Sequence, residues 1–133
     1  MLRMPRTLYD AMIEHCRREA PKEACGLLAG QGGTVTRVYP MRNVEQSPIS
    51  YAMDPREQLR VQKAMRAEET APLGIYHSHT ASPAYPSPTD VQLAYDPDAL
   101  YVVVSLAGPQ APAAQAFRIR DGRIREDDLQ VGG

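Results

Sequence analysis

The stretch of sequence that decides the fold reads Gly74-Ile75-Tyr76-His77-Ser78-His79-Thr80-Ala81-Ser82-Pro83-Ala84-Tyr85-Pro86-Ser87-Pro88-Thr89-Asp90. Its first six residues predict a short strand that runs into a loop. Side chains alternate along a strand, so His77 and His79 share one face and Ser78 points to the other. Two imidazoles on one face can hold one cation, and neutral imidazole is a common zinc ligand. With Asp90 as an oxygen ligand, a tetrahedral zinc would keep one position open for water, as catalytic sites do.

The end of this stretch also has the pattern of a helix start. Ser87 can be the N-cap, Pro88 the first helical residue and Asp90 the third-position acid of a capping box. On the loop alone, the helix cap is the commoner explanation. Both interpretations can hold together, because a capped helix start is a rigid way to aim Asp90 at a metal. The chain has three histidines and two of them lie here, which favours the metal site.

Composition narrows the class of protein. A chain of 133 residues is expected to form one domain over 1–133 that buries a core without disulfides. The net charge of −1 gives no electrostatic case for nucleic acid or an anionic membrane as partner. No apolar run reaches transmembrane length and no signal peptide is evident, so a cytoplasmic location is expected. Cys16 and Cys25 are too few for a thiolate zinc site and are consistent with a reducing compartment.

Apolar periodicity predicts two longer helices and a short one. The pair Thr7 and Asp10 is typical of a capped helix start, and Pro21 ends this helix because the residue before proline avoids helical geometry. His15 lies off the apolar stripe and is expected to be exposed or half-buried. The second helix is predicted over 54–69 and the short helix over 88–95. The inner residues expected in the second helix are Leu59, Val61, Ala64 and Met65.

Strand patterns alternate with these helices. Residues 100–106 form the most hydrophobic stretch and predict a strand covered on both faces. The pairs Gly32-Gly33 and Asp121-Gly122 each predict a hairpin. Residues 1–6 are expected to be frayed, and 126–133 are weakly patterned. The predicted strands span 22–30, 34–39, 74–79, 100–106, 114–120 and 123–125.

Glu23 is the candidate general base for a metal-bound water. It begins a predicted strand and leads into the apolar run Cys25–Ala29, so it lies at a strand mouth or is paired. Taken alone, a glutamate at a strand end is more often solvated. Taken with the two histidines, it would complete a set of metal, water and proton acceptor.

The order and spacing of these residues resemble the JAMM (MPN-plus) zinc metalloprotease family in its small prokaryotic form. The pattern is Glu23, then His77-Ser78-His79, then seven residues before Ser87 and two more before Asp90. The string Glu23-Ala24-Cys25-Gly26-Leu27-Leu28 also resembles prokaryotic members. The resemblance implies an α/β fold with a single JAMM/MPN domain, in which helices flank a twisted, mixed, largely antiparallel sheet.

The resemblance also implies a role for each motif residue. His77, His79 and Asp90 would bind Zn²⁺. Glu23 would hold and deprotonate the zinc water, then pass the proton to the leaving amine. Ser87 would donate a hydrogen bond to the oxyanion that develops in the transition state.

The family implies a peptide or isopeptide bond as substrate, cut after the C-terminal Gly-Gly of a ubiquitin-like protein. Small bacterial relatives release an amino acid, notably cysteine, from a sulfur carrier of the ThiS/MoaD type, and we expect that broad class here. One alternative is a deubiquitinase-like isopeptidase that acts on protein conjugates. Another is a non-catalytic MPN scaffold or binding module, although such relatives generally lack motif residues and this chain lacks none. A zinc deaminase is disfavoured because its signature is absent.

Several points stay open at the level of sequence. These are the ubiquitin-like partner, the residue released and the oligomeric state, a homodimer included. Cys25 could share a face with Glu23 and lie near the site, although a small buried cysteine is the commoner case. The end of the chain, Val131-Gly132-Gly133, resembles the tail of a ubiquitin-like substrate, although a flexible terminus is commoner.

Overall fold

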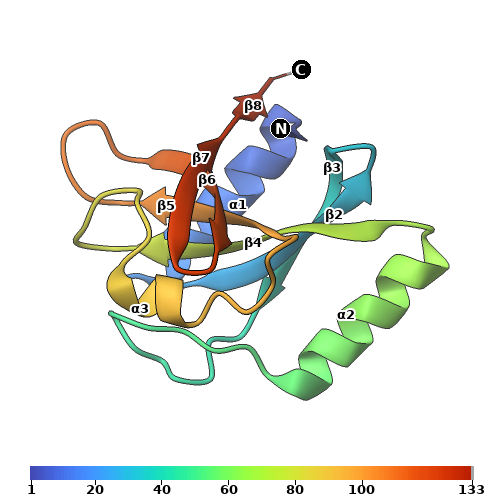
Figure 1. Ribbon diagram of the computed structural model, residues 1–133, viewed down its shortest axis with the longest axis horizontal. Helices are drawn as coiled ribbons and strands as arrows, with labels where there is room; N and C mark the ends of the chain where they lie inside the picture. The colour runs from blue at the N-terminus through green and yellow to red at the C-terminus, as the bar shows by residue number, and fades with distance from the viewer. Residues whose placement is uncertain (133) are drawn as a thin grey trace.

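The computed structural model describes residues 1–132, in which eight strands form one sheet accompanied by three helices (Figure 1). Gly133 of the C-terminal pair lies outside the described residues. The elements in chain order are β1 (Leu2–Met4), α1 (Arg6–Glu19), β2 (Cys25–Gln31), β3 (Thr34–Met41), α2 (Pro55–Ala67), β4 (Ala71–His79), α3 (Pro88–Gln92), β5 (Leu100–Ser105), β6 (Ala113–Arg120), β7 (Arg123–Asp127) and β8 (Leu129–Val131).

The sheet is mixed, in the strand order β7-β6-β5-β4-β2-β3-β1-β8. The pairs β2–β3, β2–β4, β5–β6 and β6–β7 are antiparallel, whereas β4–β5, β1–β3 and β1–β8 are parallel. This confirms the expected mixed, largely antiparallel sheet. β7 and β8 stand at opposite ends of the order, yet only Asp128 separates them in sequence. The sheet must therefore curl until its two edges approach each other, and both chain ends lie close together in Figure 1.

Two apolar clusters cover the two faces of the sheet. On one face, α1 packs Met12 and Cys16 against Leu28, Tyr76 and Val102 of the central strands. On the other face, α2 contributes to a second cluster, composed of Cys25, Leu27, Ala29, Tyr39, Met41 and Met65. All six residues of β5 are buried, as expected for a strand covered on both faces.

Strand β4 lies in the middle of the sheet between β2 and β5. The alternation along it directs Tyr76 into the α1 cluster, whereas Ile75 packs against the α2 cluster. His77 and His79 follow the parity of Ile75 and therefore leave the sheet on the α2 side. Ser78 follows the parity of Tyr76 and points toward α1. The fold thus confirms the predicted shared face of the two histidines.

The N-terminal residues are not frayed, contrary to expectation. Leu2 and Met4 are each 1% exposed, and β1 pairs in parallel with β8. The hydrogen bond from Gly132 N to Met4 O, 3.1 Å, continues this contact to the end of the described chain. β1 and β8 therefore stabilise each other although they lie at opposite ends of the sequence. A local sequence pattern cannot reveal such a pairing.

Four details of the predicted helices are also wrong. α1 begins at Arg6 after Pro5, and no side chain caps it, so Thr7 is not the N-cap. His15 is buried because its Nδ1 lies 2.7 Å from the Tyr76 hydroxyl, a polar partner that the helix pattern does not show. Leu59 is 58% exposed and does not line the core, whereas Met65 is buried as expected. α3 ends at Gln92, earlier than predicted.

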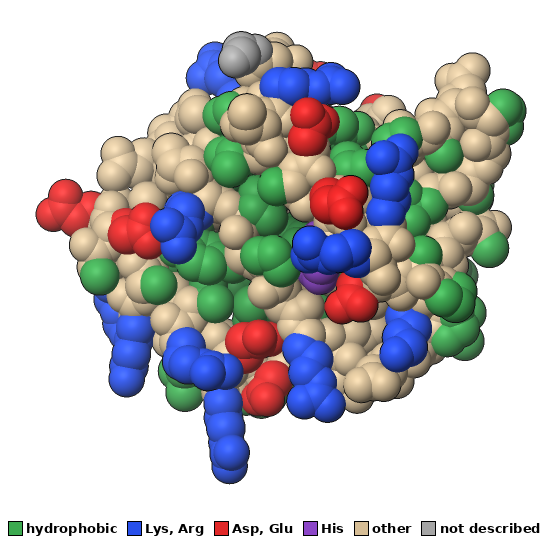
Figure 2. Space-filling view, turned by 180° about the vertical axis from the view of Figure 1, so that it is seen from behind, with side chains coloured by type: hydrophobic (Ala, Val, Ile, Leu, Met, Phe, Trp, Pro, Cys, Tyr) green, Lys and Arg blue, Asp and Glu red, His purple; other side chains and the backbone are tan. Residues whose placement is uncertain are grey.

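Charges of both signs are interspersed on the face shown in Figure 2, with no large area of a single sign. This distribution agrees with the net charge of −1. Within residues 1–132, no helix has the length and apolar character needed to span a membrane.

Candidate metal centre and active site

Three side chains converge at the end of β4. His77 Nε2 lies 3.2 Å from His79 Nε2, and Asp90 Oδ2 lies 3.0 Å from the first nitrogen and 2.9 Å from the second. The three atoms therefore form a nearly equilateral triangle. The side chains are 1%, 4% and 7% exposed, so the triangle is shielded from bulk water. The structure thus brings together the three residues that the sequence predicts as metal ligands.

A capping box at the start of α3 fixes the position of Asp90. Ser87 is the N-cap, and its Oγ accepts a hydrogen bond from Asp90 N at 3.1 Å. In return, Ser87 N donates to Asp90 Oδ2 at 2.8 Å. This is the same oxygen that faces the two imidazoles. The helix-cap interpretation is confirmed, and the cap aims the carboxylate at the two imidazoles, so it is compatible with a metal site.

The triangle suits a small divalent cation. His79 Nδ1 lies 2.9 Å from the carbonyl oxygen of Pro83, so this nitrogen donates and Nε2 of the neutral ring presents its lone pair to the triangle. Zinc bound at 2.0–2.1 Å by nitrogen and oxygen ligands separates these ligands by about 3.3 Å when tetrahedral. The observed edges of 2.9 to 3.2 Å are close to this value.

The ionisation of the three residues is consistent with metal ligation. Burial lowers the pKa of His77, which favours the neutral imidazole that binds metals. Burial opposes the charge on Asp90, but hydrogen bonds from His77 and His79 outweigh it and hold its pKa well below the usual range. Burial lowers the pKa of His79, yet hydrogen bonds to Asp90 and Pro83 outweigh burial and raise it overall. A proton and a metal therefore compete for the same nitrogen.

Glu23 lies in the segment just before β2, which begins at Cys25 and not at Lys22. Glu23 is 4% exposed, so the alternative of a solvated strand-end glutamate is wrong. Among the described residues, its Oε1 has no hydrogen-bond partner. Burial raises the pKa of Glu23 to about 7, with a positive His79 opposing and the charge of Asp90 reinforcing the rise. A buried carboxyl oxygen without a partner is costly, and such groups concentrate at functional sites.

Two site neighbours have no signature in the sequence. Tyr51 stacks on His77 with ring centroids 4.6 Å apart and an interplanar angle of 22°. Asn43 is buried, and its Nδ2 donates to the carbonyl oxygens of Glu23 and Ser50, both at 3.0 Å. Both residues lie in the segment between β3 and α2, and composition alone does not show that this segment contacts the site. Their polar or aromatic character is too common to have identified them.

A hollow of about 360 Å³ adjoins the triangle through Tyr51. Its lining is mainly apolar and includes Tyr51, Met53, Ile75, Leu93, Tyr95 and Tyr101. Leu93 and Tyr95 are 43% and 81% exposed, so the hollow opens to solvent at that end.

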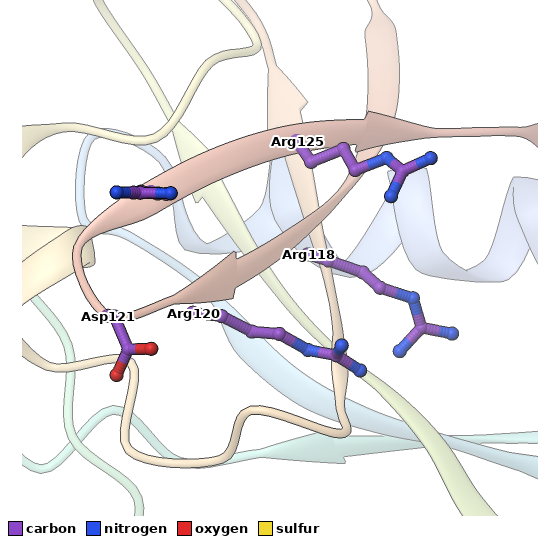
Figure 3. Close-up of a pocket in the computed structure, with 5 residues that line it drawn as sticks. Arg118, Arg120, Asp121 and Arg125 are labelled. Carbon is purple, nitrogen blue, oxygen red and sulfur yellow. The ribbon is translucent and has the colours of Figure 1, made fainter.

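A second hollow, of about 440 Å³, lies at the β6–β7 hairpin and is lined by arginines (Figure 3). Arg118 faces Arg125 across the two strands, and Arg120 faces Arg123. Arg118 Nε donates to Asp127 at 3.3 Å, and the carbonyl oxygens of Asp98 and Pro97, in the loop between α3 and β5, accept from Arg118 and Arg120. These contacts tie the hairpin to that loop. No histidine or cysteine lines this hollow, so we assign no chemistry to it.

Cys25 pairs in register with His77, one strand away from the triangle. Its side chain is fully buried in the α2 cluster, and burial raises the pKa of its thiol to about 12. Cys16 is equally buried, and both cysteines are free. Cys25 is therefore a small core residue, which was the commoner of the two readings of the sequence.

The fold and this arrangement together define a class of protein. A mixed sheet whose central strand presents two imidazoles to a carboxylate at a helix start is the arrangement of a JAMM/MPN-type domain. The family model described as prokaryotic homologs of the JAB domain matches residues 5–120. The chain belongs to this family of prokaryotic JAB-domain proteins, which confirms the resemblance seen in the sequence.

Three similar proteins carry peptidase names. The CysO-cysteine peptidase of Mycobacterium tuberculosis is 48% identical over 126 residues, which cover 93% of this chain and 86% of that protein. The "Probable TtuB-protein conjugate cleaving protease" of Thermus thermophilus is 45% identical over 69% of this chain and 62% of its own length. A desampylase of Haloferax volcanii is 36% identical, covering 74% and 76% of the two chains.

Solved structures agree with the fold. The solution structure of a protein from Desulfitobacterium hafniense has a TM-score of 0.90 and 42% identity, covering 98% of this chain and 92% of the other. A JAB1/MPN domain protein from Archaeoglobus fulgidus has a TM-score of 0.65 and 16% identity, covering 99% and 100%. At 16% identity the second likeness shows the fold alone.

Proposed function

We propose that this chain is a zinc metallopeptidase that hydrolyses the peptide or isopeptide bond after the C-terminal Gly-Gly of a ubiquitin-like or sulfur-carrier protein. The observation that carries the proposal is the triangle of His77, His79 and Asp90, together with the buried, unpartnered carboxyl oxygen of Glu23, whose pKa responds to the charges of His79 and Asp90. The peptidase names of similar proteins give the reaction class. All five motif residues come from one chain, so the site needs no second copy. Two free, buried cysteines fit the cytoplasmic location that we include in the proposal.

His77, His79 and Asp90 would hold the metal, and imidazole with carboxylate is a ligand set that zinc accepts. Bound zinc supplies Lewis acidity and lowers the pKa of a coordinated water to about 7. The protein contributes the rigidity of the ligand set. A buried strand holds the two imidazoles, and the capping box of α3 holds the carboxylate.

Glu23 would act as the general base and then as the general acid. Its buried carboxyl group has a pKa raised to about 7 by desolvation. A group with a pKa near the working pH can both accept the proton of water and return it to the leaving amine. Its unpartnered Oε1 leaves one oxygen available for that transfer.

Ser87 would stabilise the oxyanion. Its Oγ accepts from Asp90 N, which leaves the hydroxyl proton available to donate to another acceptor. A donor held in place before the reaction stabilises charge that exists mainly in the transition state. The N-cap position supplies that rigidity.

The proposed substrate rests on the names of the similar proteins and on the apolar hollow beside Tyr51. The similar protein of Mycobacterium tuberculosis is named a CysO-cysteine peptidase, so a cysteine-bearing sulfur carrier is our first candidate. Two glycines let a substrate backbone come close to a buried site where a β-carbon would collide. The hollow beside Tyr51 would accommodate the residues that precede them as an extended segment.

A second candidate is an isopeptidase that acts on protein conjugates. The Thermus and Haloferax relatives are named for that kind of substrate. A non-catalytic scaffold is disfavoured, because a scaffold has no need for a buried carboxylate beside the three converging ligands.

Mass spectrometry of a small carrier protein separates these candidates. A ThiS/MoaD-type carrier with cysteine added after Gly-Gly is incubated with the zinc-loaded protein, beside a matched carrier whose last glycine is alanine. We expect loss of cysteine from the first carrier only. Equal cutting of both carriers, or cutting of ubiquitin chains alone, would contradict the proposed substrate class.

A further inference from the structure

Ser78, the serine between the two metal-site histidines, makes a contact with Ala24 that has no role in the reaction proposed above. Ser78 has no exposed surface and points away from the triangle, toward α1. Its backbone N donates to Ala24 O at 3.0 Å, and its Oγ accepts from Ala24 N at 2.8 Å. A regular antiparallel pair would exchange two main-chain bonds. Here the hydroxyl of Ser78 takes the place of one carbonyl oxygen.

This substitution occurs where the chain leaves the sheet. Ala24 is the last residue before β2, and Glu23 precedes it. Glu23 N donates to Ser47 O at 2.8 Å, so the backbone has already turned from β4 toward the neighbouring loop. The Ala24 N–H is buried at that turn and would cost free energy if left without an acceptor. The Ser78 hydroxyl supplies the acceptor and permits the turn.

The position of the Glu23 carboxyl group depends on its backbone. Its Oε1 has no hydrogen-bond partner among the described residues, so no bond at that oxygen orients it. Asn43 holds the Glu23 carbonyl from the loop side, and Ser78 holds the adjacent amide from the strand side. Only the second anchor lies on β4, the strand that carries His77 and His79.

We propose that Ser78 is a positioning residue, which fixes the general base relative to the metal ligands through the Ala24 amide. This inference rests on the proposed role of Glu23. β4 then carries two of the three ligands, His77 and His79, and the hydroxyl that anchors the base, so the spacing of these groups is set within one rigid element. A displacement of about 1 Å in a reacting group can cost on the order of 100-fold in rate.

The first test compares substitutions on one face of β4. Ser78→Ala should retain the metal and lower kcat about tenfold or more with KM unchanged, whereas Ser78→Thr, which keeps the hydroxyl, should restore most of the rate. Tyr76→Phe is the matched control, because it removes a buried hydrogen bond to His15 on the same strand and face without touching Glu23. If Ser78→Ala does not fold, Ser78→Cys offers a similar shape with a weaker acceptor. An equal loss of kcat in the Tyr76→Phe control would overturn the inference.

The second test asks whether Ser78 acts through Glu23. In a Glu23→Gln background, Ser78→Ala should cause little further loss of kcat on the cysteine-extended carrier. The full loss in that background would overturn the role of Ser78 and leave the proposed function standing. Wild-type kcat in Glu23→Gln alone would instead overturn the base assignment.

Amide hydrogen exchange gives a readout that does not depend on activity. In the metal-free protein, the Ala24 amide should exchange at least tenfold faster in Ser78→Ala than in wild type. The same amide should be unchanged in Tyr76→Phe. Unchanged exchange at Ala24 in Ser78→Ala would show that the hydroxyl does not hold this segment, whatever the outcome of the cleavage assays.

Discussion

Asp90 Oδ2 lies 3.0 Å from His77 Nε2, although the two residues are 13 positions apart and lie on a helix and a strand. The same oxygen accepts from Ser87 N within the capping box. A local helix cap and a long-range polar contact therefore share one atom. This sharing explains how a loop rich in proline and serine holds a carboxylate rigidly beside two imidazoles.

The first prediction concerns metal content. The wild-type protein should bind one zinc per chain, because three ligand atoms converge within hydrogen-bonding distance of one another. His77→Ala should abolish this binding, whereas His15→Ala, which changes the one histidine outside the site, should retain it. Metal analysis of the purified proteins checks this. Near-stoichiometric zinc in His77→Ala would refute the ligand assignment.

The second prediction separates the two roles of Ser87. Ser87→Ala should cost about 1 kcal/mol of stability through the lost cap and also lower kcat, though less than substitution of Glu23. Asp54→Ala is the control, since Asp54 caps α2 through Arg56 N at 2.9 Å and lies outside the proposed catalytic set. Thermal unfolding and cleavage are measured for both variants. If Ser87→Ala loses stability but keeps the wild-type kcat, Ser87 acts only as a helix cap.

The third prediction concerns the stacking of Tyr51 on His77. A neighbour that orients a ligand ring can change metal affinity about 10- to 100-fold. Tyr51→Ala should therefore weaken zinc binding about tenfold, whereas Tyr51→Phe should keep the stack and the affinity. Competition with a chelator measures both. Equal weakening by the two substitutions would assign the effect to the hydroxyl group instead.

The fourth prediction concerns the pH dependence of stability without metal. Because burial raises the pKa of Glu23 from 4.5 to about 7, the folded state binds this proton more tightly than the unfolded chain. Its contribution is fully present below pH 4.5 and is lost as the pH rises to about 7. At pH 8, Glu23→Gln should therefore be more stable than wild type by up to about 3 kcal/mol.

Denaturant unfolding in the presence of a chelator measures this difference. The advantage of Glu23→Gln should shrink toward zero near pH 4, where the wild-type carboxyl group is protonated in both states. Glu14→Gln, at an exposed position on α1, should show no comparable gain. A constant advantage at every pH would exclude ionisation of Glu23 as its cause.

The sequence predicts those parts of the site that follow from local rules. The alternation of a strand places His77 and His79 together, and a capping box places Asp90 and Ser87 at a helix start. Glu23 is different, because its burial depends on Asn43 and on the turn that Ser78 permits. In the sequence it is a candidate because it precedes an apolar run in a chain that carries the histidine pair, and the family resemblance supports it; the structure adds its burial and its unpartnered oxygen.

Two of the remaining errors share one cause, which is pairing between distant positions. β1 lies between β3 and β8, and β8, at the other end of the chain, pairs with it over Leu2–Met4. His15 is buried only because the Tyr76 hydroxyl, 61 positions away, satisfies its ring nitrogen. Local periodicity cannot show either contact, because each contact forms only when distant parts of the chain come together in the folded sheet.

The most direct test of the central claim is the cleavage rate of zinc-loaded Glu23→Gln on the cysteine-extended carrier, relative to wild type. An amide cannot accept the proton of water, and a general base contributes roughly 10²- to 10⁴-fold to rate. We therefore expect unchanged zinc content and a rate lower by that factor. A rate within a few-fold of wild type, at equal zinc content, would contradict the assignment of this site as a Glu23-dependent metallopeptidase centre.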